Sequence, residues 1–247
     1  MKTLSRFLAL ALAFAAGGAH AVSDDDVAAT FQPPPRDATI LLLVEKADSS
    51  PLDRAGAMLE KQLQKQLADD GYRTAVLDIA DYQALEAAEA AALGEHPHGK
   101  FIPASSAAKA NALSKLARIA KSESHCDMLI RARIVERKAA LGGQYAEWDG
   151  RRRGLIFEGA NDLDVANGGH SRVVSVNVKG STTVLSVELV AFDGTGARDF
   201  VTHGAVVVPL VWNLKLKSTS VRTDLFQTDE DVADGLQIAL APMRGKR

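Results

Sequence analysis

The sequence contains a single cysteine, Cys126, among 247 residues. A lone cysteine cannot form a disulfide within its own chain, so the fold must depend on a hydrophobic core and not on covalent links. The chain also lacks an excess of either charge, because 29 Lys and Arg residues stand against 31 Asp and Glu residues. Without a strong positive field or a long cationic run, no nucleic-acid partner is expected.

Long apolar runs are also missing after the N-terminus, so no transmembrane segment is expected in the mature chain. At the N-terminus, two basic residues precede an apolar stretch from Phe7 to Ala16, and the small residues Ala19 and Ala21 follow. This pattern predicts a signal peptide, residues 1–21, that is cleaved after Ala21. The cleavage point lacks the cysteine of a bacterial lipoprotein, so we expect a periplasmic protein.

The mature chain is predicted to consist of an acidic, proline-rich tether, residues 22–37, and one folded domain, residues 38–247. Pro33 to Pro35 favour an extended polyproline conformation within the tether. The domain opens with ATILLLVEK, residues 38–46, whose continuous apolar run predicts a central strand that is covered on both faces.

The first half of the domain alternates between helical and strand patterns. Residues 50–71 carry Ser50 as an N-cap, Pro51 at the first helical position and leucines at helical spacing, which predict an amphipathic helix. A strand over 73–81 and two further helices, over 82–93 and 105–124, follow on the same reasoning.

From about Arg153 the pattern changes to alternating strands, over 172–179, 182–192 and 210–217, with turn chemistry at 193–196. The last segment predicts a helix whose inner face is formed by Val232, Leu236, Ala239 and Leu240. The expected fold class is therefore α/β (α+β). It is a single three-layer domain with a mixed sheet, N-terminal βαβ units, an antiparallel meander and a closing C-terminal helix.

Five segments in this order resemble a known family: 38–44, 55–67, 71–78, 116–134 and 182–199. Their sequence order is similar to the α/β domain shared by the curli secretion lipoprotein, lipoprotein activators of penicillin-binding proteins and the N-terminal domain of the Tol-Pal translocation protein. The resemblance covers most of residues 38–242. It implies an adaptor in the cell envelope. Polar residues such as Asn177, Lys179 and Glu188 on the strand faces argue against a lipid-facing pore.

Cys126 lies between His125 and Asp127, the side chains that a thiol enzyme would use. Alternation along residues 126–137 puts Cys126 on the apolar face of a strand together with Met128, Ile130, Ala132 and Ile134. Neighbours in a strand point to opposite sides of the sheet, so a triad is not expected. We predict that Cys126 is a buried core residue and that the chain has no catalytic thiol.

Ligand-type side chains occur at His96 and His98, which an extended segment could direct at one metal ion. No third ligand has recognisable spacing, and a solvated loop explains the pair equally well. The glycines Gly194 and Gly196 do not form a dinucleotide fingerprint, and no phosphate-binding loop is present. No metal or cofactor is therefore predicted.

The segment 141–154 is the predicted partner-binding site. It combines aromatic residues with an arginine cluster, a mixture that is enriched at protein interfaces; its candidate residues are Tyr145, Trp148, Arg151, Arg152 and Arg153. The alternative is a hairpin or loop whose aromatic side chains fold back on the domain.

Two functions are consistent with these observations. The first is a non-enzymatic periplasmic interaction protein that binds one or more envelope proteins during envelope assembly or transport. The second is a periplasmic hydrolase whose carboxylates, for example Asp162, Asp164 and Asp193, converge only in the fold. A cleft with two carboxylates of shifted pKa would favour the hydrolase, and a flat surface of aromatic and arginine side chains would favour the interaction protein. The sequence does not identify the partner or the oligomeric state.

Overall fold

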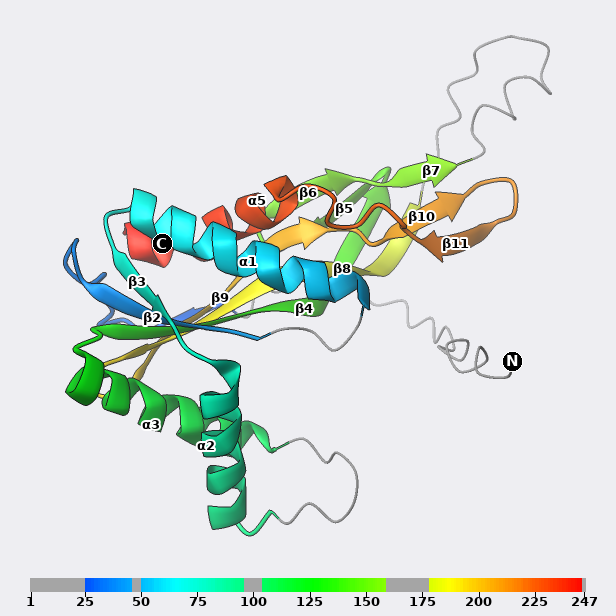
Figure 1. Cartoon of the computed structure of the whole chain (residues 1–247). Helices are drawn as coiled ribbons and strands as arrows, with labels where there is room; N and C mark the ends of the chain where they lie inside the picture. The colour runs from blue at the N-terminus through cyan, green and yellow to red at the C-terminus, as the bar shows by residue number, and fades with distance from the viewer. Residues whose placement is uncertain (1–24, 46–49, 96–103, 159–177, 246–247) are drawn as a thin grey trace, which may run out of the picture.

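The computed structural model of the chain describes residues 25–45, 50–95, 104–158 and 178–245 (Figure 1). The predicted signal peptide and the residues His96, His98, Asp162 and Asp164 lie outside these ranges. Among the helices that are described, none is long and apolar enough to cross a membrane.

A mixed sheet of eight strands forms the centre of the molecule, and its main path runs β1-β9-β8-β4-β2-β3. Strand β2 is parallel to both β3 and β4, whereas β4, β8 and β9 pair antiparallel. The strands on this path are β1 (Asp26–Val27), β2 (Thr39–Val44), β3 (Arg73–Val76), β4 (Met128–Gly143), β8 (Val178–Asp193) and β9 (Arg198–Val207). The predicted α/β class with a mixed sheet is therefore confirmed.

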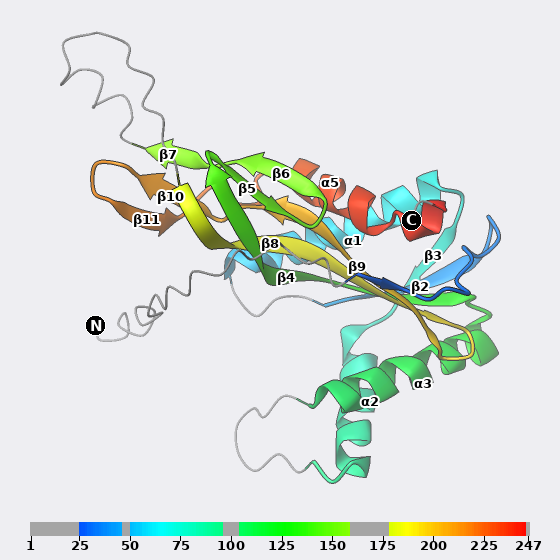
Figure 2. The ribbon, with the colours of Figure 1, turned by 180° about the vertical axis from the view of Figure 1, so that it is seen from behind.

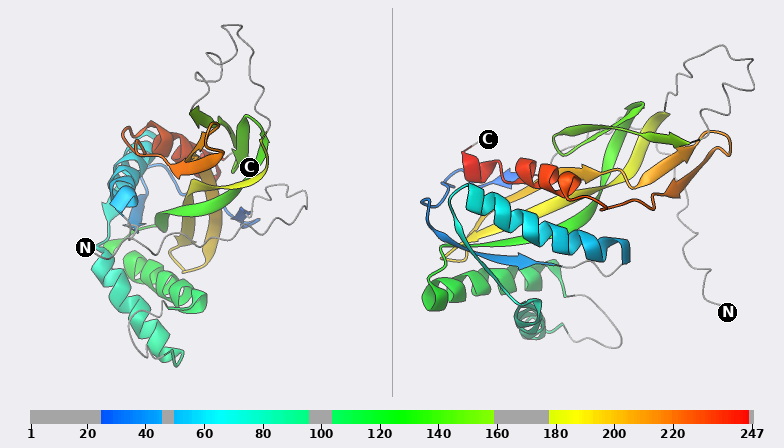
Figure 3. Two further views of the ribbon diagram at one scale, coloured as in Figure 1. Left: turned by 90° about the vertical axis from the view of Figure 1, so that its right-hand side faces the viewer. Right: turned by 45° about the horizontal axis from the view of Figure 1, so that its top comes forward.

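Helices cover both faces of this sheet (Figure 1, Figure 2). The helices α1 (Ser50–Asp69) and α5 (Glu230–Ala239) lie on one face, and α2 (Ile79–Ala92) and α3 (Ser106–Ser124) lie on the other. Leu59, Leu63 and Leu67 of α1 are fully buried against the sheet, as their spacing predicts. Figure 3 shows α1 and α5 side by side, and the Gln66 side chain donates to the Ala233 carbonyl between them.

The closing helix packs on the sheet through the residues that the sequence indicates. Val232, Leu236 and Leu240 are fully buried in the same core as α1, which confirms the prediction. Gly204 of β9 faces Gly235 of α5 so closely that a Cβ atom at Gly204 would collide with the Gly235 carbonyl. Glycine at both positions therefore lets the helix backbone lie directly on the strand.

Strands β4 and β8 are each 16 residues long, and their far halves extend beyond the helices. These far halves carry the hairpin of β5 (Tyr145–Trp148) and β6 (Arg151–Gly154). Next to them lies a three-stranded sheet of β7 (Ile156–Glu158), β10 (Leu210–Asn213) and β11 (Ser218–Val221). We call this projection the arm (Figure 2). It has an apolar cluster of its own, in which Trp148 is the largest buried side chain. The sequence predicts neither the length of β4 nor the arm.

The N-terminal segment that was predicted as a tether belongs to the folded domain from Asp25 onwards. β1 adds to the edge of β9, and the Phe31 ring packs edge-on against Phe200 with 5.3 Å between ring centroids. Phe31 is only 7% exposed. The proline-rich composition was a poor guide here, because a single buried aromatic residue can anchor an extended segment.

Cys126 is buried and makes no disulfide, as predicted. Its predicted face is wrong, however, because Cys126 packs with α3 whereas Met128 and Ile130 pack on the opposite side of the sheet. His125 ends α3 in the left-handed region, at φ 53°, and the regular strand begins only at Met128. Burial, together with the negative charge of Asp127, raises the pKa of the Cys126 thiol, which is unsuited to a nucleophile.

The predicted strand over 210–217 also ends early. β10 stops at Asn213, whose side-chain oxygen accepts a hydrogen bond from the Leu216 backbone N–H, and Lys217 adopts φ 51°. The chain therefore turns and returns as β11. A strand over 210–217 would put Leu216 on the same face as Trp212, but Leu216 is 71% exposed in this turn.

Candidate functional site

A network of charged side chains lies across β4, β8 and β9, on the sheet face that α2 and α3 cover only in part. The strand registers place Arg133, Glu188 and His203 directly opposite one another on three neighbouring strands. Side chains that are directly opposed on one face are within contact distance, so the pairing of the strands brings these charges together.

Glu188 is the centre of this network. Its Oε1 accepts hydrogen bonds from Arg131 Nη2 at 2.6 Å and from Arg133 Nε at 2.7 Å. Burial alone would raise the pKa of Glu188, but hydrogen bonds from His203 and Arg133 and the nearby arginine charges hold it well below its usual range. Glu188 is therefore an anion at neutral pH. The Glu45 carboxylate lies 3.5 Å from Nε of Arg131, the arginine that also forms an ion pair with Glu188.

His203 lies between two carboxylates and is only 3% exposed. Its Nδ1 is 2.8 Å from Asp25 Oδ1, which also accepts a hydrogen bond from the His203 backbone N–H, and its Nε2 is 3.5 Å from Glu188 Oε2. Burial lowers the pKa of His203, but Asp25 and Glu188 outweigh this effect and raise the pKa to about 9. The ring is thus a cation at neutral pH and cannot act as a general base there.

A second set of contacts joins the network to the tip of the β5–β6 hairpin. Arg137 donates two hydrogen bonds to Asp149, at 3.2 and 3.1 Å, and the Ser186 hydroxyl donates to Asp149 Oδ2 at 2.6 Å. Trp148 Nε1 donates to the Ser186 oxygen at 3.1 Å. The Ser186 proton therefore points to a carboxylate in the hairpin turn, an arrangement that holds the hairpin in place.

The structure separates the five predicted partner-binding residues into two groups. Trp148 is 1% exposed and belongs to the core of the arm. Its side chain therefore folds back on the domain, as in the alternative interpretation, and it is not available to a partner. Arg151 and Arg153 form ion pairs with Asp234 at 2.5 Å and with Asp231 at 2.8 Å. Trp148 thus packs the hairpin against β4 and β8, and the two arginines bind it to α5.

Tyr145 and Arg152 remain on the outer face of the hairpin, where both are exposed. The Arg152 guanidinium carbon lies 4.1 Å from the centroid of the Tyr145 ring, which is a cation–π contact, and Tyr145 is 43% exposed. Glu147, also exposed, lies directly opposite Arg152 in the hairpin register. Partner binding at this face stays a prediction, now for Tyr145 and Arg152.

Asp193 and Asp199 are the pair of carboxylates that bears on the hydrolase alternative. Burial, with a further effect from the charge of Asp193, raises the pKa of Asp199 to about 6. Asp193 Oδ1 accepts hydrogen bonds from the Thr195 N–H, the Thr195 hydroxyl and the Ala197 N–H. One member of the pair is thus engaged in forming the turn between β8 and β9.

Within the described ranges, His, Cys, Asp and Glu side chains form no group of three or more that could hold a metal ion. Comparisons of the chain with family models, with curated proteins and with solved structures found no match. The functional argument therefore depends on the geometry above.

Sequence patterns did not reveal the network residues Asp25, Ser186, Glu188 and His203. One signal was present, since Glu188 interrupts the apolar run of residues 184–192 on a strand that is otherwise buried. A charged side chain in such a run is stable only with a partner. That partner can be identified only when the register across three strands is known.

The His203 contacts predict that the protein loses stability in alkaline solution. The pKa of His203 is raised in the folded state, from 6.5 to about 9. Its stabilising effect is therefore complete below about pH 6.5 and is lost as the pH rises through 9. We expect the free energy of unfolding to fall by about 2 kcal/mol between pH 7 and 10. This is less than the pKa shift of His203 alone implies, because the Asp25 side chain is 36% exposed and solvent weakens its interaction with the ring.

Urea unfolding at a series of pH values measures this dependence, and His203→Gln is the matched variant. The variant should be less stable than the parent at pH 7 and should lose much less stability between pH 7 and 10. Parallel curves for the two proteins would show that His203 is not the titrating group. The other ionisable groups that face the ring are Asp25, Glu188 and Arg137, which belong to the segment before β1, to β8 and to β4.

Proposed function

We propose that the protein is an exported, non-catalytic interaction module that serves cell-envelope assembly or transport. It binds an envelope protein through the outer face of the β5–β6 hairpin. The observation that carries the proposal is the exposed stack of Arg152 on Tyr145. Aromatic and arginine side chains supply both buried area and directional hydrogen bonds, and they dominate the binding energy of many interfaces.

The support beneath this face favours the same function. Three kinds of contact fix the inner side of the hairpin. Trp148 donates a hydrogen bond to Ser186, Arg137 pairs with Asp149 in the hairpin turn, and the arginines of β6 form ion pairs with α5. A binding surface whose backbone is fixed before the partner arrives loses less conformational entropy on association. The polar side chains of the arm thus prepare a rigid platform.

The state of the buried polar groups also favours binding over catalysis. The Ser186 hydroxyl donates to a carboxylate, His203 is a cation held between two carboxylates, and Glu188 is an anion held by two arginines. Nucleophiles and general bases need a free lone pair at the working pH. The Ser186 oxygen accepts the Trp148 indole N–H, the His203 ring is protonated, and the Glu188 carboxylate is held by arginines, so none of the three offers a free lone pair. Their arrangement favours a structural network.

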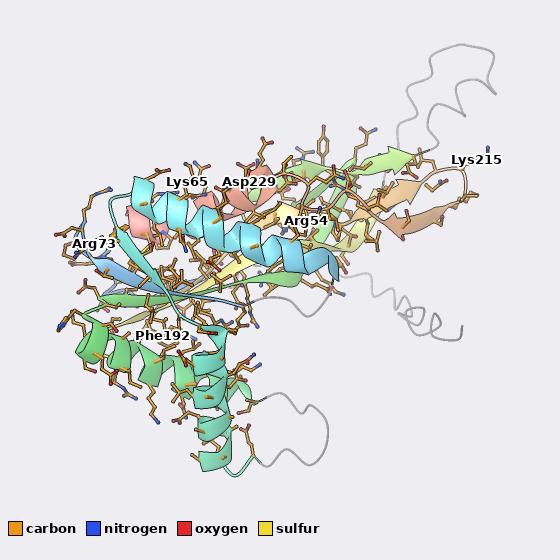
Figure 4. The ribbon with its side chains drawn as sticks, viewed as in Figure 1. Arg54, Lys65, Arg73, Phe192, Lys215 and Asp229 are labelled. Carbon is orange, nitrogen blue, oxygen red and sulfur yellow. The ribbon has the colours of Figure 1, made fainter. Side chains whose placement is uncertain are left out.

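Photo-crosslinking in cells tests the proposal. A photoreactive amino acid at Glu147 lies on the outer face between Tyr145 and Arg152, and one at Lys65 on α1 serves as the control (Figure 4). We expect Glu147 to capture a distinct envelope protein that Lys65 does not capture. Adding Tyr145→Ala should reduce the yield at Glu147. Equal products at both positions would contradict the proposed surface.

A second candidate function, a periplasmic hydrolase, has one observation in its favour: the pKa of Asp199 is raised to about 6, which suits a general acid. This function predicts that the purified protein hydrolyses a model ester, glycoside or phosphoester, and that Asp199→Asn abolishes the reaction. Turnover that survives in Asp199→Asn, or no turnover on any such substrate, leaves the interaction module as the better account.

A further inference from the structure

The topology of the parallel strands draws attention to the carboxyl end of β2. This strand lies between β3 and β4 and is parallel to both. The chain leaves β2 through α1 on one face of the sheet and reaches β4 through α2 and α3 on the other face. In open α/β sheets, ligands bind beyond the carboxyl ends of the strands at such a topological switch point. The expected place for a ligand is therefore around Glu45, the residue that follows β2.

The sheet has a gap next to this point. On one side of β4, pairing with β2 ends at Ala132 and pairing with β5 begins only at Ala140. Among the described strands, none lies beside β4 between these two residues. Figure 1 shows that α2 points away from the sheet, so that only its first turns lie close to β2. Arg133, the first residue in the gap, has a side chain that is 36% exposed, so solvent reaches the charged network here.

Two buried polar atoms near Glu45 have no hydrogen-bond partner. One is the hydroxyl oxygen of Tyr82, a residue that is 2% exposed, and the other is Nε of Arg131, whose side chain is 7% exposed. Within the described ranges, Arg153 Nε is the one other buried side-chain atom in this condition. A buried polar group without a partner costs free energy, so two such groups in one network indicate a binding partner for them.

Electrostatic interactions connect the two atoms to the same neighbours. Arg131 Nε lies 3.5 Å from Glu45 Oε1. Burial raises the pKa of Tyr82 well above its usual value, and the charges of Glu45 and Arg131 also act on it. Glu86, one turn further along α2, raises the same pKa, although its contact with the hydroxyl lacks the geometry of a hydrogen bond. The Tyr82 hydroxyl therefore keeps its proton and is a donor, as is Arg131 Nε.

We propose that these residues bind a neutral saccharide through its hydroxyl groups. The buried donors of Tyr82 and Arg131 require an acceptor, and the carboxylates of Glu45 and Glu86 beside them require a donor. An anion would be repelled by the two carboxylates, and a cation would be repelled by Arg131 and Arg133. A hydroxyl group both accepts and donates, so a sugar hydroxyl can accept from Arg131 Nε and donate to Glu45.

Glu45 is the side chain that moves to admit the sugar. It is 25% exposed, and its contacts with Arg131 and Arg133, at 3.5 and 4.0 Å, are longer than hydrogen bonds. Arg131, by contrast, is held by the 2.6 Å hydrogen bond from its Nη2 to Glu188, so its Nε keeps its direction. The site thus combines a fixed donor with a carboxylate that is free to adjust to the ligand.

Nuclear magnetic resonance tests the class of ligand, because the Arg131 Nε–H gives its own signal in a ¹H–¹⁵N spectrum of the full-length protein. Glucose, galactose, mannose and sucrose are the probes, and phosphate, acetamide and ethylammonium are the controls. We expect a saturable shift of this signal with at least one sugar and none with the controls. A shift from a control but from none of the sugars, or no shift from any compound, would overturn the saccharide site.

Tyr82→Phe tests the role of the hydroxyl. Because this hydroxyl has no hydrogen bond in the free protein, its removal should leave the urea midpoint of unfolding unchanged or higher. The dissociation constant of the bound sugar should rise about tenfold, as expected for one lost hydrogen bond. Equal sugar affinities of the parent and Tyr82→Phe would contradict the assignment. A lower midpoint in Tyr82→Phe, with no sugar shift in the parent, would show that the hydroxyl binds an ordered water only.

Tyr72→Phe is the matched control, because Tyr72 is also a buried tyrosine but packs in the core on the other face of the sheet. Its hydroxyl lies 3.4 Å from the carbonyl oxygens of Pro34 and Met243. The variant should therefore lower the urea midpoint and leave sugar affinity unchanged. A loss of sugar affinity equal to that of Tyr82→Phe would move the binding site away from β2. None of these results depends on the hairpin face proposed above for the envelope partner.

Discussion

Replacing Trp148 with alanine should lower the free energy of unfolding by about 3–5 kcal/mol, the range found when large buried aromatic residues are truncated. Trp148 is 1% exposed, fills the apolar cluster of the arm and donates its indole N–H to Ser186. The change removes this packing and leaves a cavity between β5 and β8. Urea unfolding, followed by circular dichroism, measures the loss.

Tyr145→Ala is the matched control for Trp148→Ala, because both residues are aromatic and both lie on β5. Tyr145 is on the outer face and 43% exposed, so its truncation should change the free energy of unfolding by less than about 1 kcal/mol. Equal losses in the two variants would mean that the two faces of the hairpin are assigned wrongly.

Glu188→Gln should destabilise the protein by about 3–5 kcal/mol, which is typical when one partner of a buried ion pair is removed. The amide keeps the shape of the side chain but not its charge. The buried cations Arg131, which is 7% exposed, and His203 would then lose the carboxylate that they share. Their positive charge would no longer be balanced. Unfolding in urea at pH 7 gives the measurement.

Two further variants make the interpretation of Glu188→Gln specific. Glu136→Gln changes an exposed glutamate on the neighbouring strand β4 and should leave stability nearly unchanged. Adding His203→Gln to Glu188→Gln removes one uncompensated cation and should cost less than the sum of the two single changes. Strict additivity of the two single losses would argue against a coupled network.

Periodicity predicted the body of the fold because each of its elements buries one continuous apolar stripe. The leucines of α1, the run of β2 and the last helix all follow this rule, and all three are in the core. Strand β9 could not be predicted in this way, because Thr202, His203 and Gly204 interrupt any alternation. Those residues are explained only by contacts with α5 and with the N-terminal Asp25.

The predicted binding segment shows the same limit at the level of single residues. Composition singled out Tyr145 and Arg152, which form an exposed stack in the structure, but it could not distinguish the buried Trp148 from the exposed Tyr145. Alternation along β5 makes that distinction once the strand is known, since Trp148 shares the inner face with Ala146. The arginines alternate in the same way, so Arg151 and Arg153 contact α5 and Arg152 does not.

The central claim is that the outer face of the β5–β6 hairpin binds an envelope protein, and the most direct test is an affinity measurement with the protein captured at Glu147. Isothermal titration should show that Tyr145→Ala weakens binding by about 2 kcal/mol, or roughly thirtyfold. Lys65→Ala changes an exposed residue of α1, outside the hairpin, and should leave the affinity unchanged. Equal affinities of the parent, Tyr145→Ala and Arg152→Ala would contradict the claim and remove this face from the interface.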